Sequence, residues 1–201
     1  MYNITKNTAL LVIDAQNEYF KEYGSLYTPN AQLCEDNLKR LINKFKEKGL
    51  TVIFIQHLHK PDGSNVGRMG DFDQTPIFIE GSDGAKILQS LSVDSSDMVI
   101  RKNRYSSFIG TNLHDYLQAK GIDTVVISGL MTNYCCLSTA FNASDLDYKT
   151  IVAIDAVQGP DMPDLGYGKI PQEQVKNVVA TTLLFGVADV IATKELINQM
   201  E

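Results

Sequence analysis

The chain of 201 residues has little of several features that define large protein classes. Two of its three cysteines, Cys135 and Cys136, are sequence neighbours, so a disulfide framework is excluded and free thiols in a reducing cytoplasm are expected. A formal net charge of −6 gives no basic surface for nucleic acid or an anionic membrane. The first apolar run, residues 9–13, is too short to cross a bilayer, and the residues before it lack a signal-peptide pattern. We therefore predict a cytoplasmic protein with neither nucleic-acid nor membrane partners.

Internal repeats, low-complexity tracts and linkers are also missing from the sequence. A chain of this length that is 44% hydrophobic and 21% charged can bury one sizeable core. We predict a single domain over residues 1–201.

Short apolar runs rich in β-branched residues alternate with amphipathic stretches along the chain. The runs are residues 9–13, 51–55, 98–100, 124–127, 150–154 and 187–191, and the helical patterns are residues 30–48, 112–120, 133–146 and 172–184. Runs that are apolar without alternation are typical of strands covered on both faces, and strands that alternate with helices form right-handed βαβ units. The pattern predicts a three-layer αβα fold of the α/β class, with an open, mainly parallel, six-stranded Rossmann-like sheet.

Three reactive side chains follow three of these runs. Asp14 ends the first, Lys102 ends the third, and Cys135 lies just beyond the fourth. Ligands of open parallel sheets bind beyond the carboxyl ends of the strands, so we expect the three to share a site. Each alone has an ordinary explanation as a helix cap, a solvated charge or a small core residue, and the prediction depends on their joint placement. Cys34, within the first helical pattern, we interpret as core.

The three groups suit nucleophilic catalysis. A thiol with a pKa of ~8.5 needs activation at neutral pH, and a helix N-terminus or a nearby ammonium favours the thiolate. A carboxylate can take the thiol proton and return it to a departing amine. The pattern therefore predicts Cys135 as nucleophile, with Asp14 and Lys102 as its partners.

At these residues the sequence resembles the isochorismatase-like cysteine hydrolases over nearly its full length. The similar segments are residues 8–20 with Asp14-Ala15-Gln16-Asn17, residues 102–113 that open with the lysine, and residues 128–135 that end with the cysteine. The resemblance implies a Cys-Asp-Lys triad, a cis peptide bond at Leu130–Met131, and an oxyanion hole made by the Met131 and Cys135 backbone N–H groups. It also implies a homo-oligomer, a dimer or a tetramer. It places Cys136 where the family usually has a small apolar residue, so we interpret Cys136 as core.

The resemblance also narrows the reaction. The family's vinyl-ether-cleaving members lack the cysteine, so Cys135 favours the branch that cleaves C–N bonds. Nicotinamidases carry a metal site of one aspartate and two histidines after the second strand. Here His57 replaces the aspartate, His59 matches one histidine and Gly63 replaces the other. We predict no metal and no cofactor, although these two histidines could hold a metal if another ligand arrived from elsewhere.

The turn before the cysteine, with Thr132 and Asn133, resembles that of members acting on ureido and amide compounds. Leu137 and Phe141 replace a glutamate and an arginine that are common there, so the individual substrate stays open. By position we predict seven pocket-lining residues: Gln16, Phe20, Gln56, His57, Tyr105, Phe108 and Tyr134. The irregular segment 59–82 is either a binding loop or a surface loop.

Three alternatives to this reaction remain to be weighed. A dinucleotide-binding oxidoreductase needs a glycine-rich turn after the first strand, and residues 14–17 contain no glycine. A non-catalytic relative that binds a small ligand is disfavoured by the complete set of three reactive groups. A nicotinamidase-like or isochorismatase-type hydrolase of other bond specificity is not excluded by the sequence.

Overall fold

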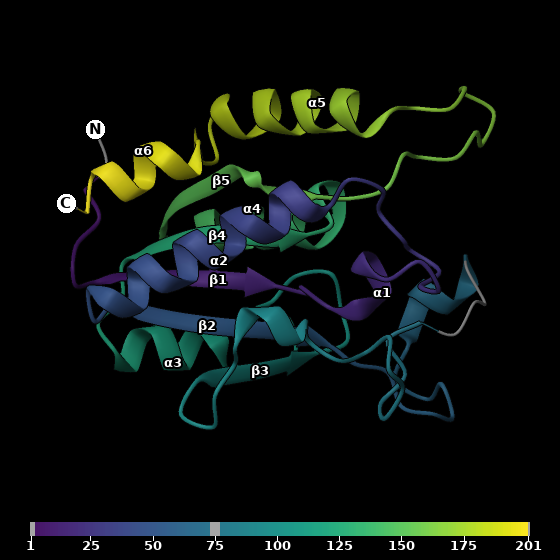
Figure 1. Ribbon diagram of the computed structural model, residues 1–201, viewed down its shortest axis with the longest axis horizontal. Coiled ribbons are helices and arrows are strands. Elements are labelled where there is room, and N and C mark those ends of the chain that lie inside the picture. The colour runs from purple at the N-terminus through teal and green to yellow at the C-terminus, as the bar shows by residue number, and fades with distance from the viewer. Residues whose placement is uncertain (1–2, 73–76, 201) are drawn as a thin grey trace.

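The computed structural model describes residues 3–72 and 77–200, and its centre is a six-stranded sheet (Figure 1). The strand order is β3-β2-β1-β4-β5-β6, and every neighbouring pair is parallel. The strands are β1 (Thr8–Ile13), β2 (Thr51–His57), β3 (Met98–Lys102), β4 (Thr124–Leu130), β5 (Lys149–Gln158) and β6 (Asp189–Ile191). All six coincide with the predicted apolar runs, so the predicted α/β fold is confirmed.

Helices cover both faces of the sheet. They are α1 (Asn17–Phe20), α2 (Gln32–Glu47), α3 (Leu113–Ala119), α4 (Leu137–Asp145), α5 (Gln172–Leu184) and α6 (Thr193–Asn198). Short turns of other helical types are η1 (Gly67–Asp71), η2 (Gln89–Leu91) and the π-helical η3 (Thr132–Cys136). The four predicted helical patterns are all found, whereas α1 and α6 are too short to show a helical period. No described helix combines the length and hydrophobicity that a bilayer crossing requires.

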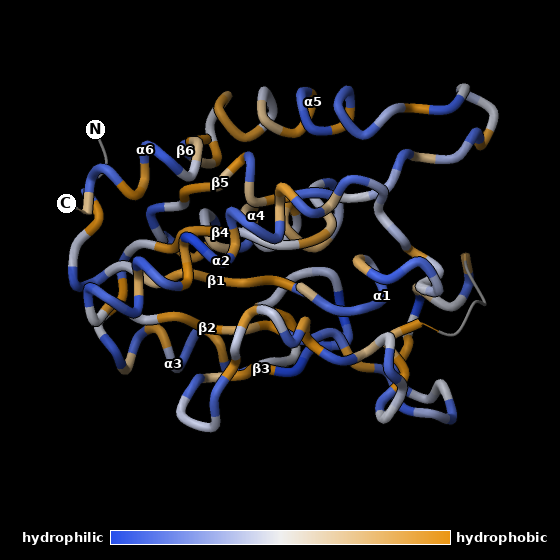
Figure 2. Tube along the Cα trace, in the orientation of Figure 1, coloured by the Kyte–Doolittle hydropathy of each residue, from blue (hydrophilic) through white to orange (hydrophobic). Residues whose placement is uncertain are grey.

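Side chains of β1 alternate between two hydrophobic cores. Leu10 and Val12 pack with α2 and α6 on one face, and Leu11 and Ile13 pack with α3, α4 and α5 on the other. Figure 2 shows the consequence, since the central strands are hydrophobic along their length while the outer helices are mixed. Burial on both faces explains why the strand sequences are continuous apolar runs.

The carboxyl ends of the strands meet at the edge of the sheet that lies away from the two termini (Figure 1). Gly129, with φ of 107°, lets β4 approach β1 there, because a Cβ at this position would lie 1.9 Å from the carbonyl oxygen of Ile13. Asp14 follows directly with φ of 47°, a left-handed conformation that is uncommon for a residue with a side chain. Uncommon backbone conformations of this kind are typical of functional sites. Here the conformation of Asp14 turns the chain at the end of β1.

Candidate active site

The structure brings Asp14, Lys102 and Cys135 together beyond the sheet edge. Lys102 Nζ lies 2.6 Å from Asp14 Oδ2 and 3.3 Å from Cys135 Sγ, and it also donates to the carbonyl oxygen of Arg104 at 3.0 Å. The three residues are carried by the ends of β1 and β3 and by η3. The sequence-based expectation that they share a site agrees with this geometry.

The site is buried and charged. The side chains of Asp14 and Lys102 are fully buried. Burial alone would raise the pKa of Asp14, but the Lys102 ammonium and the hydrogen-bonding groups of Lys102 and His57 outweigh it and lower that pKa below its ordinary value. Burial likewise works against the ammonium, and the carboxylate and thiol beside it raise the pKa of Lys102. The two groups therefore form an ion pair at neutral pH.

Cys135 is only 3% exposed, and this burial decides its protonation. Desolvation raises the pKa of its thiol to about 12, because the nearby Lys102 ammonium only partly offsets burial and Asp14 adds a second raising influence. The Lys102 ammonium favours the thiolate, as expected, but burial outweighs it. The thiol is therefore protonated at neutral pH.

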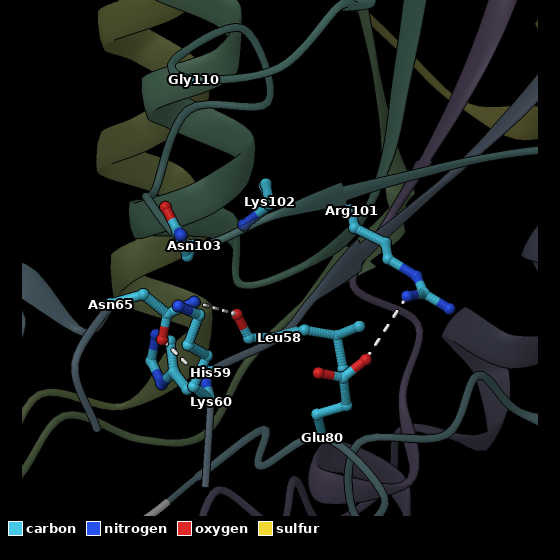
Figure 3. A pocket seen from close by; sticks show the side chains of 9 residues that line it. All are labelled: Leu58, His59, Lys60, Asn65, Glu80, Arg101, Lys102, Asn103 and Gly110. Atoms are coloured by element: carbon cyan, nitrogen blue, oxygen red, sulfur yellow. Dashed lines mark hydrogen bonds and ion pairs between the residues drawn. The ribbon is translucent and has the colours of Figure 1, made fainter. Parts of the chain in front are cut away.

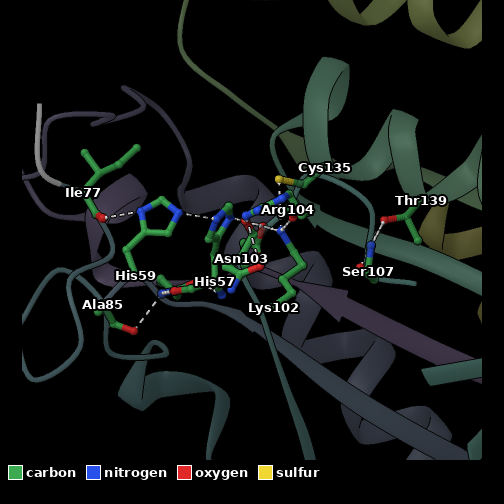
Figure 4. A network of polar contacts seen from close by, with 12 residues as sticks. His57, His59, Ile77, Ala85, Lys102, Asn103, Arg104, Ser107, Cys135 and Thr139 are labelled. Atoms are coloured by element: carbon green, nitrogen blue, oxygen red, sulfur yellow. Dashed lines mark hydrogen bonds and ion pairs between the residues drawn. The ribbon is translucent and has the colours of Figure 1, made fainter. Parts of the chain in front are cut away.

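Two histidines continue the polar cluster from Lys102 (Figure 4). His57 Nδ1 lies 3.1 Å from Lys102 Nζ and 3.9 Å from Asp14 Oδ2, and His57 Nε2 lies 3.0 Å from His59 Nε2. His59 Nδ1 in turn lies 3.2 Å from the carbonyl oxygen of Ile77. Burial first, and then the Lys102 ammonium, lower the pKa of His57 to about 4, so its ring is neutral at pH 7.

Part of the segment 59–82 covers this cluster. Phe78 is 2% exposed, and its ring stacks on that of His57 with centroids 4.9 Å apart and planes at 12°. Its neighbour Ile79 forms a parallel bridge with His59. The segment is therefore a wall of the site where the structure describes it, and its residues 73–76, which include Pro76, lie outside the described part.

The turn before Cys135 contains the cis peptide bond expected from the resemblance. The peptide bond Leu130–Met131 is cis. Among the described residues, the Met131 N–H has no hydrogen-bond acceptor, whereas the Met131 carbonyl accepts from Cys136 N–H at 3.1 Å. A further contact, from Ser107 N–H to Thr139 Oγ1 at 3.0 Å, fastens the segment after β3 to α4. These contacts fix the relative placement of the lysine and cysteine segments.

Three of the predicted pocket residues contact backbone groups or the hydrophobic core. Gln16 is fully buried, and its amide donates to the carbonyl oxygens of His57 and Ala85 while accepting from His57 N–H, so no N–H of its amide is free for a substrate. Gln56 also donates to the Ala85 carbonyl, at 2.8 Å. Phe108 packs in the core, stacked with Tyr148 at 5.9 Å. These contacts hold the three side chains against neighbouring backbone and core groups, and their place in a substrate pocket stays a prediction.

The other predicted pocket residues remain near the site. His57 contacts Lys102, as described above. Tyr105 and Tyr134 are 38% and 37% exposed, and their rings lie 5.2 Å apart. Phe20 is half-buried and packs against the cluster that contains Phe78. The two tyrosines therefore offer an aromatic rim beside the buried cysteine.

A cleft of about 190 Å³ opens on the side of Lys102 and His59 (Figure 3). Its lining residues are Leu58, His59, Lys60, Asn65, Glu80, Arg101, Lys102, Asn103 and Gly110. Arg101 and Glu80 face each other across it at 3.4 Å. Cys135 and Asp14 are not part of the lining, so this cleft meets the polar cluster from its lysine side.

The remaining thiols match their interpretation as core. Cys34 is 3% exposed in the core beneath α2, and Cys136 is 2% exposed in the core on the opposite face. Burial, the largest influence, raises the pKa of Cys34 to about 12 and that of Cys136 well above its usual range.

A metal ion would find three donor residues here. Donor atoms of Asp14, His57 and Cys135 all lie within 4.8 Å of one another. Thiolate, imidazole and carboxylate are the ligands that zinc prefers. However, the Lys102 ammonium already contacts all three residues, at 2.6, 3.1 and 3.3 Å. An ion at this point would have to displace the ammonium.

Sequence reasoning missed the supporting groups. Phe78 and the carbonyl oxygens of Ile77, Ala85 and Arg104 hold the site residues, yet no motif marks them. A backbone carbonyl carries no side-chain signature, and most of these groups lie in irregular segments without a period.

Comparison with known proteins shows the family to which the chain belongs. Residues 8–168 match the Isochorismatase domain. A cysteine hydrolase from Pseudomonas syringae pv. phaseolicola 1448A has a similar structure, with a TM-score of 0.94 and 28% identity over 100% of this chain and 95% of that one. A probable inactive nicotinamidase of Arabidopsis thaliana is 31% identical over 165 residues, which are 80% of this chain and 84% of that protein. The ureidoacrylate amidohydrolase RutB of Yersinia enterocolitica is 30% identical over 180 residues and 78% of each chain. The protein therefore belongs to the isochorismatase family of hydrolases.

Proposed function

We propose that the protein is a cysteine hydrolase that cleaves a C–N bond of a small amide, ureide or carbamoyl compound through a thioester. The observation that carries this proposal is the contact of one buried ammonium, Lys102 Nζ, with both Asp14 Oδ2 and Cys135 Sγ. A buried thiol beside a carboxylate and a fixed positive charge has both a proton acceptor and a stabiliser for the charge that develops. A similar relative that is a ureidoacrylate amidohydrolase supports the C–N bond class.

In the first step Asp14 takes the thiol proton as Cys135 Sγ attacks the substrate carbonyl. Asp14 Oδ1 accepts no hydrogen bond from the described residues, so it has a lone pair available for this proton. The Lys102 ammonium stabilises the carboxylate before transfer and the sulfur as its charge grows. The Met131 and Cys135 N–H groups hold the oxyanion of the tetrahedral intermediate.

In the second step the intermediate collapses. The C–N bond breaks, Asp14 returns its proton to the departing ammonia or amine, and a thioester on Cys135 remains. Water then attacks the thioester while Asp14 accepts a proton from it. Sulfur leaves as the thiol, and the acid product departs.

The substrate is tested by measuring ammonia or amine release from a panel of carboxamides, ureido acids, carbamoyl amino acids and nicotinamide. We expect turnover with at least one member of the amide or ureide classes and a mass increase on Cys135 that corresponds to its acyl group. Nicotinamide covers the nicotinamidase-like alternative. Turnover without any acyl adduct, retained in a Cys135→Ala variant, would contradict the mechanism.

A non-catalytic relative that binds a small ligand is the second candidate, since one similar protein is a probable inactive nicotinamidase. The complete set of Asp14, Lys102 and Cys135 in contact favours the enzyme. Absence of turnover with every compound of the panel, together with tight binding of one of them, would favour the binding protein.

The homo-oligomer implied by the resemblance stays a prediction. Leu165, Tyr167 and Phe185 are 78%, 94% and 94% exposed and lie before and after α5, where they are available for contact with a second copy. Light scattering after size exclusion measures the mass directly, and a monomer would refute this part.

A further inference from the structure

Four groups form a continuous chain of polar contacts that starts at Lys102 and ends at a backbone carbonyl (Figure 4). The distances are 3.1 Å from Lys102 Nζ to His57 Nδ1, 3.0 Å between the two Nε2 atoms of His57 and His59, and 3.2 Å from His59 Nδ1 to the oxygen of Ile77. Each is a hydrogen-bonding distance between nitrogen and nitrogen or oxygen.

The two ends of the chain fix its direction. An ammonium can only donate, so His57 Nδ1 must accept, and a carbonyl oxygen can only accept, so His59 Nδ1 must carry a hydrogen. With neutral rings, His57 then carries its hydrogen on Nε2 and donates it to the bare Nε2 of His59. One arrangement satisfies all three contacts, and the opposite one would turn an N–H toward the ammonium and a lone pair toward the carbonyl.

We propose that His57 is a positioning residue that takes one of the three ammonium protons of Lys102, and that His59 holds His57 in the tautomer able to take it. The inference rests on the proposed function, since it concerns the lysine beside the proposed nucleophile. Neither histidine is assigned contact with the substrate.

The need for such an acceptor follows from a count around Lys102. The three ammonium protons have three hydrogen-bond acceptors among the described residues, on Arg104 at 3.0 Å, His57 at 3.1 Å and Cys135 at 3.3 Å. Asp14 Oδ2 lies 2.6 Å away as the counter-charge of the ion pair. By accepting one N–H, His57 helps to hold the ammonium in the orientation in which another N–H points to the sulfur.

The surroundings keep His57 neutral and in place. Its side chain is 1% exposed, and the stacked Phe78 ring fixes its plane. The charged and titratable groups that face the two rings are Asp14, Lys102, Arg104 and the thiol of Cys135. A positive charge on either ring would stand next to a lysine and would break the direction of the chain.

Nitrogen-15 imidazole spectra of the unmodified protein at pH 7.5 test the tautomers without any substrate. We expect the Nε2–H form for His57 and the Nδ1–H form for His59. The opposite tautomer on either ring overturns the proposal.

The pH dependence of Cys135 alkylation by iodoacetamide, followed by peptide mass spectrometry, tests the effect on the thiol. In His57→Leu one N–H of Lys102 loses its acceptor and the ammonium is no longer held toward the sulfur, so we expect the alkylation midpoint to rise by about 1 pH unit, which is a tenfold slower reaction at a fixed pH below it. In His57→Asn an amide oxygen replaces Nδ1 as acceptor, so the midpoint should stay at the wild-type value. A His57→Leu midpoint that stays or falls overturns the proposal.

His59 offers a matched pair of variants. In His59→Gln the amide oxygen can accept from His57 Nε2–H, whereas in the smaller His59→Asn it stays near Ile77 and cannot reach. We expect wild-type alkylation in His59→Gln and a raised midpoint in His59→Asn, and equal profiles in the two overturn the role of His59. Should Cys135 resist iodoacetamide in every variant, its role as an accessible nucleophile fails, while the tautomer spectra still decide the inference.

Discussion

Two buried thiols on opposite sides of the sheet have nearly the same acidity and very different surroundings. Cys34 in α2 and Cys135 in η3 are each 3% exposed, and burial, the largest influence on both, raises each pKa to about 12. Cys34 lies among aliphatic side chains such as Leu38 and Ile42. Cys135 Sγ instead lies 3.3 Å from the ammonium of Lys102, which is itself paired with Asp14. A low resting pKa therefore does not distinguish the proposed nucleophile here, but a proton acceptor and a cation within reach do.

Exchange of each thiol for alanine is expected to separate the two sites most strongly. Cys135→Ala should abolish hydrolysis, a loss of at least about 10³-fold, because the thiol that contacts the Lys102–Asp14 pair is then missing. Cys34→Ala should keep the rate and lose only stability, by about 1–2 kcal/mol for the small cavity. Steady-state rates and urea unfolding of both variants measure this contrast. Equal activities in the two would remove it.

Removal of the Asp14 carboxylate should lower both stability and activity. No equivalent change exists around Cys34, whose neighbours are apolar. Asp14→Asn leaves the Lys102 ammonium buried without its counter-charge, and we expect a loss of about 3–5 kcal/mol in the free energy of unfolding, together with loss of activity. Asp36→Asn is a matched control, since that carboxylate is 52% exposed and pairs only with Lys39 and Gln32 on its own helix. Similar unfolding curves for the two variants would show that the ion pair contributes little.

A fall in pH should lower the free energy of unfolding, because His57 is buried as a neutral ring. Its pKa is lowered from 6.5 to about 4 in the folded protein, so the unfolded chain binds more protons between these values. Stability conferred by the neutral ring is therefore complete above pH 6.5 and is lost as the pH falls toward 4, by about 3 kcal/mol. Urea unfolding of wild type and His57→Asn across pH 4–7 isolates this part, because the variant lacks the titrating ring. Parallel curves would show that His57 is not buried in its neutral form.

The three reactive residues and the predicted pocket residues differ in how far the sequence predicts their positions. Asp14, Lys102 and Cys135 follow directly from strand ends, because a parallel sheet brings those ends to one edge whatever the loops do. Gln16, Gln56 and Phe108 were predicted in the pocket from position alone, and the structure shows them held by backbone carbonyls and the core.

The supporting side of the site was beyond sequence reasoning for a physical reason. Phe78 and the Ile77 carbonyl come from a segment without periodicity, and their contacts with the histidines depend on the path of the chain. The sequence aligned both histidines with the metal-ligand positions of nicotinamidases. It did not indicate the direction of their hydrogen bonds. That direction follows only from the groups at both ends of the chain.

The smallest expected effect concerns the aromatic rim of Tyr105 and Tyr134. It refines the description of the surroundings of Cys135 and leaves the contrast with Cys34 unchanged. Tyr105 is 38% exposed and its ring lies 5.2 Å from that of Tyr134, so Tyr105→Ala removes contact area at the entrance but no charge. We expect KM to rise about 3- to 10-fold, with kcat changed by less than about threefold, because the contact acts equally on ground and transition states. Initial rates over a range of substrate concentrations separate the two constants, and the Cys135 alkylation profile serves as the control for an intact site. A fall in kcat with unchanged KM would mean that Tyr105 acts on the thiol itself, and the rim would then belong to the charged cluster rather than to its entrance.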